Sequence, residues 1–288
     1  MVLLSALRPR HWLKNLLVVV APLTAGSMTM LAGYQLLIAF VSLSFAASAM
    51  YLVNDVRDRS RDQDHPSKRF RAIASGKVTP ATAFALAAVL LGISGALGWL
   101  LSPAFFATVV AYVVATLVYS LWLKSAPAVD IVLLASFFVL RIFAGGLATQ
   151  VEVSSWLLAT SFFAFLSIAA AKRVVELSVM AESSEGGFVS GRGYVSTDLG
   201  VVQTVGVGVG ISSALLLGLY VETGIAASNF SSPQLLWLTV PLWIYWVLRF
   251  WIIVSRGKVD HDPIEFVLKD WISYAVVVAL ALLLVIAQ

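Results

Sequence analysis

Residues 104–123 read AFFATVVAYVVATLVYSLWL, twenty positions without a charged side chain. At about 1.5 Å of rise per residue, a helix of this length spans about 30 Å, the thickness of the hydrocarbon core of a bilayer. The run is continuously apolar, whereas the strands of a membrane β-barrel alternate between apolar and polar residues. This stretch therefore predicts a membrane-spanning helix.

The rest of the chain has the same character. Of its 288 residues, 60% are hydrophobic and 12% are charged, far from the roughly 45–50% and 25% of soluble domains. We therefore expect an all-α, polytopic membrane bundle that forms one domain over residues 1–288 and binds no nucleic acid. Nine apolar runs are candidate spans: 16–33, 36–53, 80–98, 104–123, 130–149, 155–171, 200–221, 233–254 and 271–287.

The distribution of lysine and arginine predicts the orientation of these spans. Basic residues flank the first span and fill every second gap, but the gaps around 26–35, 99–103, 150–155 and 222–233 contain none. Because basic residues are retained on the cytoplasmic side, we expect a plasma-membrane protein with its N-terminus in the cytoplasm and its C-terminus outside. All acidic residues except Glu152 and Glu222 fall on the same inner side, which topology alone does not require. We expect the functional site there.

The segment after the second span carries an acidic stripe. Asn54, Asp58 and Asp62 repeat every four residues, so a helix that continues past the membrane boundary presents their oxygens on one face. The chain has no cysteine, which leaves oxygen or imidazole ligands for any metal. Mg²⁺ fits such a stripe because it takes carboxylates and borrows further oxygens from a phosphate substrate. The alternative is a solvated acidic helix end without a metal.

Basic residues accompany the stripe. Lys68, Arg69 and Arg71 follow it closely, and cations beside a metal suit a polyphosphate ligand. Arg141 lies about ten residues into the fifth predicted span, where a charge costs roughly 2.5–3.5 kcal/mol. We expect Arg141 to meet a phosphate or Asp130; a purely structural pair and snorkelling to the surface are the alternatives.

Several further residues are weaker candidates. Lys14 and Asn15 lie at the inner end of the first span, where both could reach a phosphate. The alternative is that this segment is ordinary positive-inside flanking. Tyr119 and Tyr194 offer hydroxyl groups to phosphate oxygens. In the last inner segment, Glu265, Lys269 and Asp270 are expected on one helical face that closes the cavity, or within a turn. Glycines at 92, 95 and 98 allow close helix contact, within the chain or in a homo-oligomer.

The motifs resemble those of the UbiA-type intramembrane prenyltransferases along nearly the whole chain. Within that family, the likeness is greatest to the branch that transfers phosphoribose to decaprenyl phosphate. The segments that carry it are Arg8-Pro-Arg-His-Trp-Leu-Lys-Asn15, Asn54-Asp-Val-Arg-Asp58, His65-Pro-Ser-Lys-Arg-Phe-Arg71, Arg141-Ile-Phe-Ala-Gly-Gly146 and Lys172-Arg173-Val-Val-Glu176.

The resemblance implies a fold, a reaction and a site. The fold is about nine helices around a central cavity open to the cytoplasm. The reaction moves 5-phosphoribose from 5-phosphoribosyl 1-diphosphate to a polyprenyl phosphate with Mg²⁺ and releases diphosphate, for synthesis of cell-wall arabinan precursors. The implied metal ligands are Asn54, Asp58 and Asp62; the catalytic residues are Asp58, Asp62, Lys172 and Glu176; the substrate-binding residues are Lys14, Asn15, Lys68, Arg69, Arg71, Lys124, Arg141, Arg173 and Tyr194.

One departure from the general family pattern affects the site. Family members usually carry a second Asp-rich motif after the sixth span, where this chain has Lys172-Arg173-x-x-Glu176 followed by Arg192-Gly-Tyr194. One acid in place of a pair leaves the number of Mg²⁺ ions open, and the added cations suit a donor with an extra phosphate. Two other functions remain as alternatives: an isoprenoid diphosphate prenyltransferase with an aromatic acceptor, and a multi-span transporter or lipid-binding membrane protein.

Overall fold

The computed structural model describes residues 2–64, 68–182, 193–259 and 262–288, which form helices and no β-strand. The chain divides into two compact units. Unit 1 comprises Met1–Leu121 and Leu140–Glu152, and unit 2 comprises Trp122–Val139 and Val153–Gln288. The division falls inside helix α7 (Val129–Thr149), whose first half belongs to unit 2 and whose second half belongs to unit 1.

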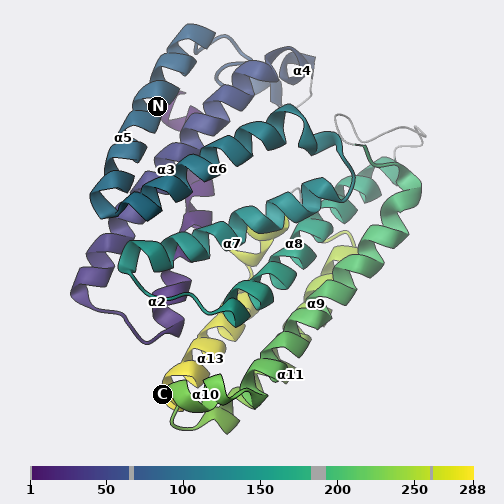
Figure 1. Ribbon diagram of the computed structural model, residues 1–288. Helices are drawn as coiled ribbons and strands as arrows, with labels where there is room; N and C mark the ends of the chain where they lie inside the picture. The colour runs from purple at the N-terminus through teal and green to yellow at the C-terminus, as the bar shows by residue number, and fades with distance from the viewer. Residues whose placement is uncertain (1, 65–67, 183–192, 260–261) are drawn as a thin grey trace. The chain divides into compact units, whose positions relative to one another are not determined.

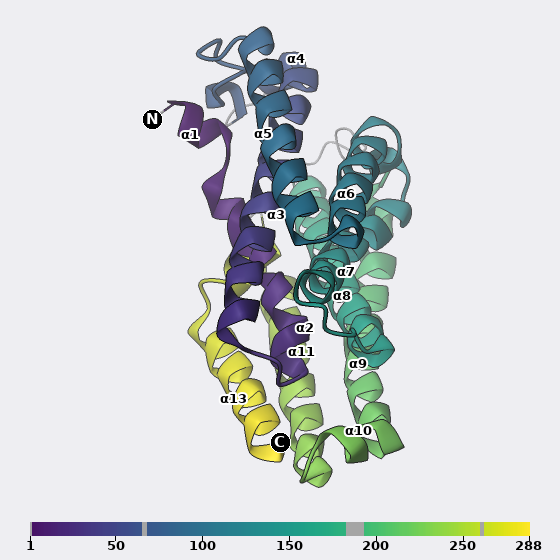
Figure 2. The same ribbon diagram turned by 60° about the vertical axis from the view of Figure 1, so that its left-hand side comes forward.

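Unit 1 is built around one long helix, which two shorter ones accompany (Figures 1 and 2). Its elements are α1 Val2–Ala6, η1 Pro9–Val19, α2 Val20–Thr24, α3 Met30–Arg57, α4 Arg59–Asp64, η2 Lys68–Phe70, α5 Pro80–Leu101 and α6 Pro103–Leu121. Helix α3 packs on α5, α6 and η1. The hydroxyls of Ser42 and Ser94 each donate to the other residue's carbonyl oxygen, at 2.9 and 2.8 Å. These reciprocal bonds lock α3 to α5 in an apolar setting where no water competes.

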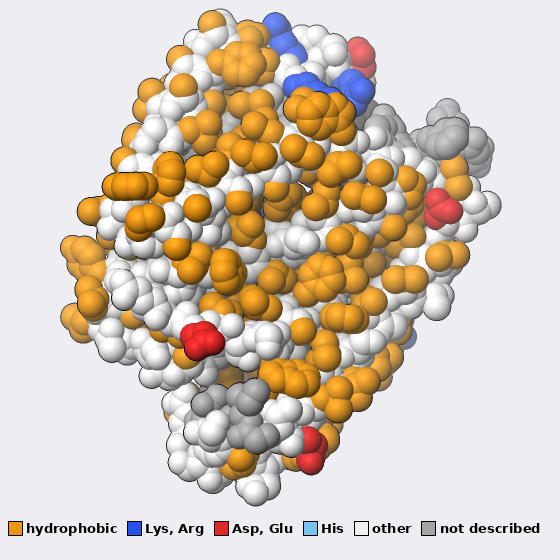
Figure 3. All heavy atoms as spheres, in the orientation of Figure 1, with side chains coloured by type: hydrophobic (Ala, Val, Ile, Leu, Met, Phe, Trp, Pro, Cys, Tyr) orange, Lys and Arg blue, Asp and Glu red, His pale blue; other side chains and the backbone are white. Residues whose placement is uncertain are grey.

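Hydrophobic and basic side chains occupy different parts of the surface of unit 1. Hydrophobic side chains cover α5 and α6 on the face in Figure 3, and lysine and arginine side chains gather near α4. Helix α5 starts with Thr79, whose hydroxyl accepts a hydrogen bond from the backbone of Thr82, and Pro80 takes the first helical position. Both residue types are typical of helix starts, so the position at which α5 begins follows from the local sequence.

Unit 2 packs its long helices through small residues and tryptophans. Its elements are η3 Leu123–Ser125, the first half of α7, α8 Ser155–Glu182, η4 Ser196–Asp198, α9 Leu199–Glu222, α10 Gly224–Asn229, η5 Pro233–Leu238, α11 Thr239–Ser255, α12 Pro263–Val267 and α13 Trp271–Ala287. Ser167 of α8 donates to the carbonyl of Gly206 at 2.7 Å and accepts from the Trp251 indole at 2.9 Å. One hydroxyl thereby joins three helices, α8, α9 and α11.

Seven described helices are long and apolar enough to cross a membrane: Met30–Arg57, Pro80–Leu101, Pro103–Leu121, Val129–Thr149, Ser155–Val179, Ser196–Glu222 and Pro233–Ser255. They match seven of the nine predicted spans, with shifted boundaries. Trp271–Ala287 is a shorter apolar helix. The predicted helix over 16–33 is wrong, because η1 and α2 end at Thr24 and α3 begins at Met30. Gly26, with a φ of 63°, turns the chain between them.

The segment η1 approaches α7 very closely within unit 1. A Cβ atom added to Gly145 would lie 1.9 Å from the carbonyl oxygen of Val18, which is backbone and cannot rotate away. Glycine is therefore required at 145 so that η1, with Asn15, can lie against α7.

We predict that Gly145→Ala lowers the free energy of unfolding by about 1–3 kcal/mol, because the two backbones must separate. Thermal unfolding in detergent measures the change. Gly92→Ala is the matched control, since a Cβ atom there meets nothing within 4 Å. Equal stability of the two variants would contradict the close approach.

Candidate active site

The acidic stripe lies where α3 gives way to α4. The expectation of one continuous helix is wrong, because α3 ends at Arg57 and Asp58 caps it with φ −87° and ψ 8°. The four-residue spacing nevertheless survives: the Asp58 amide donates to the Asn54 carbonyl, and the Asp62 amide to the Asp58 carbonyl, each at 2.8 Å. Asp62 is buried, and the other two are half-buried. The helix is interrupted at Asp58, but the three residues keep their four-residue register across the interruption.

Two arginines hold the carboxylates of this region. Arg71 Nη1 lies 2.7 Å from Asp62 Oδ2 and 3.3 Å from Asp55 Oδ1. Arg8 Nη2 lies 2.5 Å from the same Asp55 oxygen, and its guanidinium also stacks over the Tyr51 ring at 5.0 Å. Sequence reasoning missed Asp55 as a site residue, because one helical position of about 100° takes it off the stripe. Its burial beside two cations makes it part of the same charge cluster.

The predicted basic residues separate in the structure. Lys68 and Arg69 lie on η2 and are exposed, and Arg69 stacks over the Phe70 ring at 4.9 Å. Arg71 turns to the carboxylates. His65 to Ser67 lie outside the described residues. Lys68 and Arg69 therefore stand at the surface of unit 1, and Arg71 belongs to the acidic cluster.

Arg141 is buried inside unit 1. Its Nε donates to Asn15 Oδ1 at 2.7 Å, and its Nη2 to the Tyr112 hydroxyl at 3.3 Å. Asn15 also donates to the Ser44 hydroxyl at 3.0 Å. The expected contact between Arg141 and Asp130 is wrong, because eleven residues along α7 separate them by about 16 Å of helical rise. Asn15 is thus placed beside Arg141, as part of the polar cluster that accommodates its charge.

Asp130 has partners of its own in unit 2. Arg173 Nε lies 2.6 Å from Asp130 Oδ2, with side-chain exposures of 1% and 0%. The Tyr194 hydroxyl donates to Asp130 Oδ1 and accepts from the Ala128 amide, both at 2.7 Å. Burial, together with the bond to Asp130, raises the pKa of Tyr194 above its usual value. Arg173 also bonds Glu176. These contacts give Arg173 and Tyr194 a structural role, and their binding of substrate stays a prediction.

The other predicted residues are partly accessible. Lys14, Lys124, Lys172 and Glu176 are half-buried. Lys14 belongs to unit 1 and the other three to unit 2. Arg192 lies outside the described residues. Each side chain retains enough exposure to meet a ligand, so their predicted roles stay open.

The donor set of the stripe fits Mg²⁺. Asn54, Asp58 and Asp62 offer one carboxamide oxygen and two carboxylates, all hard donors. Among the described residues, no three Asp, Glu or His side chains are grouped so as to hold a metal. An ion on the stripe would therefore complete its shell with water and phosphate oxygens, as Mg²⁺ commonly does.

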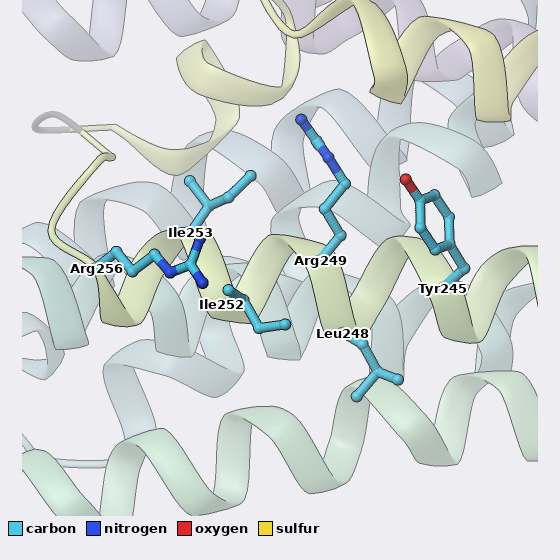
Figure 4. A pocket seen from close by; sticks show the side chains of 6 residues that line it. All are labelled: Tyr245, Leu248, Arg249, Ile252, Ile253 and Arg256. Carbon is cyan, nitrogen blue, oxygen red and sulfur yellow. The ribbon is translucent and has the colours of Figure 1, made fainter.

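The last inner segment differs from expectation. Helix α12 ends at Val267, so Glu265 and Asp270 do not share one helical face. Asp270 instead caps α13, accepting from the Ser273 amide at 2.8 Å, and forms a two-pronged pair with Arg249 at 2.7 and 2.8 Å. Arg249 lines a surface hollow on α11 together with Tyr245, Leu248, Ile252, Ile253 and Arg256 (Figure 4). Asp260 and His261 lie outside the described residues.

Comparisons with known proteins agree with the motifs. The model of the UbiA prenyltransferase family matches residues 15–271. The decaprenyl-phosphate phosphoribosyltransferase of Mycobacterium tuberculosis is 35% identical over 274 residues, which are 92% of this chain and 87% of that protein. The enzyme of the same name from Corynebacterium glutamicum is 33% identical, over 99% of this chain and 86% of its own.

A solved structure has the same fold. The UbiA homolog from Archaeoglobus fulgidus, bound to GPP and Mg²⁺, superposes with a TM-score of 0.70 over 99% of this chain and 97% of its own. Its sequence identity is 18%, so the likeness concerns the fold alone.

We predict that Tyr194→Phe destabilises the protein by about 1–3 kcal/mol, because buried Asp130 and the Ala128 amide both lose a partner. Thermal unfolding measures it. Tyr245→Phe, at a side chain that is half exposed, serves as the control and should change little. If the variant is as stable as the wild type, the hydrogen bonds of Tyr194 to Asp130 and Ala128 do not contribute to stability.

A second prediction concerns Asp270. Burial alone would raise its pKa, but hydrogen bonds from Arg249 and Ser273 outweigh burial and lower it. A lowered folded-state pKa stabilises the fold above the unfolded pKa of about 4, and this stabilisation is lost as pH falls through the folded value. Asp270→Asn should therefore lower the unfolding temperature at pH 7, with a difference from wild type that shrinks below about pH 4. Glu265→Gln, at an exposed pair with Lys269, should show neither effect.

Proposed function

This chain belongs to the UbiA prenyltransferase family, and on that premise we propose that it transfers 5-phosphoribose from 5-phosphoribosyl 1-diphosphate to a polyprenyl phosphate and releases diphosphate. The observation that carries the proposal is 33–35% identity, over nearly the whole chain, to relatives named decaprenyl-phosphate phosphoribosyltransferase. The product is then a precursor for cell-wall arabinan. The acidic stripe and the arginines beside it support a diphosphate-bearing donor.

The protein is an integral membrane protein, and we propose nine crossings with the N-terminus in the cytoplasm. Two further crossings are needed in addition to the seven long helices, and we propose that η1 with α2 forms one and α13 the other. The 11 residues of η1 rise about 2.0 Å each, and the 5 residues of α2 about 1.5 Å each. Together they reach about 30 Å, a bilayer thickness. Helix α13, with 17 apolar residues, supplies the ninth crossing.

Charge balance supports this choice of substrates. The donor carries about four to five negative charges and a lipid phosphate about two more. Unit 1 offers exposed Lys68 and Arg69 near the stripe, and half-buried Lys14. Unit 2 offers Lys124 and Lys172. The cations of unit 1, with Mg²⁺, would offset much of the charge of the donor's diphosphate.

In the proposed reaction, an oxygen of the lipid phosphate attacks the anomeric carbon of the donor. The bond from that carbon to the diphosphate breaks, and the diphosphate leaves with the electron pair. The nucleophile is already ionised, so the chain need not supply a base. Asn54, Asp58 and Asp62 would hold Mg²⁺, which supplies charge stabilisation to the leaving diphosphate when bound. Lys68 and Arg69 share that charge, and Lys172 and Glu176 position the acceptor.

A second candidate is a prenyltransferase that moves an isoprenoid group from its diphosphate to an aromatic acceptor. The likeness in fold to a homolog bound to GPP and Mg²⁺ favours it, since the same stripe serves either diphosphate. A transporter is disfavoured, because the relatives that are 33–35% identical over nearly the whole chain are named as phosphoribosyltransferases.

The choice of donor tests the proposal. Purified protein is expected to transfer radiolabel from phosphoribosyl diphosphate to polyprenyl phosphate, and chelation by EDTA should abolish the transfer. Geranyl or farnesyl diphosphate with an aromatic acid is the parallel assay. Turnover in that assay, and none with phosphoribosyl diphosphate, would establish the second candidate instead.

The stripe has its own test. Asp58→Asn removes one carboxylate from the metal ligands and is expected to lower phosphoribosyl transfer by about a hundredfold or more, a loss of roughly 2.7 kcal/mol of transition-state stabilisation. Asp64→Asn is the matched control, since Asp64 is an exposed carboxylate at the end of α4 and should keep most of the activity. Equal rates for the two variants would exclude the stripe as the metal site.

A further inference from the structure

The acidic cluster of unit 1 has an unequal distribution of counter-ions. Asp55 has two arginine partners, Arg8 at 2.5 Å and Arg71 at 3.3 Å, on the same oxygen. Asp62, a member of the stripe, is paired with Arg71 at 2.7 Å. Removal of Arg71 would therefore leave Asp55 neutralised by Arg8 and would leave Asp62 in need of another cation.

The Arg71 side chain can move away from Asp55 and Asp62 while the backbone of Arg71 stays in place. The three residues that follow it, 72–74, are buried in the core of unit 1, and the Arg71 carbonyl accepts from the Ser75 amide at 2.9 Å. The Arg71 side chain itself is 33% exposed, whereas those of Asp55 and Asp62 are 8% and 5% exposed. Of the two arginines, Arg8 is the more firmly held, because the Tyr51 ring also contacts it.

We propose that Arg71 is an exchangeable counter-ion that makes the binding of a divalent metal at Asp62 conditional on diphosphate. The inference rests on the proposed function, since it concerns the same stripe. A metal that binds alone must displace the guanidinium and leave it without an anionic partner. When diphosphate binds as well, its oxygens accept the displaced guanidinium, and arginine pairs well with phosphate.

Thermodynamic linkage gives this arrangement a measurable form. If diphosphate strengthens metal binding by some factor, the metal strengthens diphosphate binding by the same factor. The arrangement excludes the free ion from the empty site and selects the complete metal and diphosphate pair. A purely structural role for Arg71 predicts lower stability without Arg71 and predicts no gain in metal affinity.

The test measures the affinity of the full chain for Mn²⁺, which substitutes for Mg²⁺. Equilibrium dialysis in detergent is carried out with and without inorganic pyrophosphate. A chamber without protein corrects for Mn²⁺ complexed by pyrophosphate in solution. For the wild type we expect pyrophosphate to tighten Mn²⁺ binding by about tenfold or more, within the usual range of coupling. For Arg71→Gln we expect Mn²⁺ alone to bind at least about fivefold more tightly than to wild type, and pyrophosphate to add much less.

Two matched variants separate charge from position. Arg61→Gln removes the same charge from an exposed side chain of α4, one residue from Asp62, and should leave the affinity for Mn²⁺ alone as low as in wild type. Arg71→Lys keeps a cation beside Asp62 and should also keep that affinity low. Thermal unfolding of each variant shows that it is folded.

Two outcomes would overturn the inference. The inference is overturned if the wild-type protein binds Mn²⁺ equally well with and without pyrophosphate. This result decides the question even if Arg71→Gln fails to fold. Tighter binding of Mn²⁺ alone by Arg61→Gln to the same degree as by Arg71→Gln would reduce the effect to net charge. Either result leaves the proposed function standing if phosphoribosyl transfer occurs, whereas absence of transfer by the wild type rejects the function itself.

Discussion

Charged groups placed away from water must be neutralised or hydrogen-bonded within the protein, and this constraint organises both units. The cost of an isolated charge in an apolar medium exceeds that of almost any other local defect. Arg141 is therefore enclosed by Asn15 and Tyr112, and Asp130 by Arg173 and Tyr194. Each cluster joins segments far apart in the sequence. The polar residues of this chain thus hold its helices in register, in addition to any chemistry they perform.

The clusters differ in how easily they can change. The pair of Asp130 and Arg173 is almost completely buried, and breaking it would leave a bare charge, so it is permanent. The pair of Asp62 and Arg71 has one accessible partner, and a ligand that supplies new opposite charges can reorganise it. Only the second kind of cluster suits a site that must bind and release a highly charged substrate. This difference separates the structural arginine of unit 2 from the exchangeable arginine of unit 1.

Local sequence patterns predicted the features that depend on neighbours along the chain. Apolar runs predicted the long helices, and the four-residue spacing of Asn54, Asp58 and Asp62 kept its register through the break at Asp58. The misjudged features depend on distant partners. Asp55 lies off the stripe and is recruited by Arg8, and Arg141 finds Asn15 instead of Asp130. The 3₁₀ conformation of η1 also escaped prediction, because apolar composition does not distinguish it from an α-helix.

By itself, the sequence determined that this protein spans a membrane, that it is helical, and that a stripe of oxygen-bearing side chains lies beside basic residues. These properties follow from composition and from spacing along a single helix, which are local quantities. Tertiary structure alone decided which arginine neutralises which carboxylate. Pairing depends on the distance between side chains from different segments, and only the packing of the segments within each unit sets that distance.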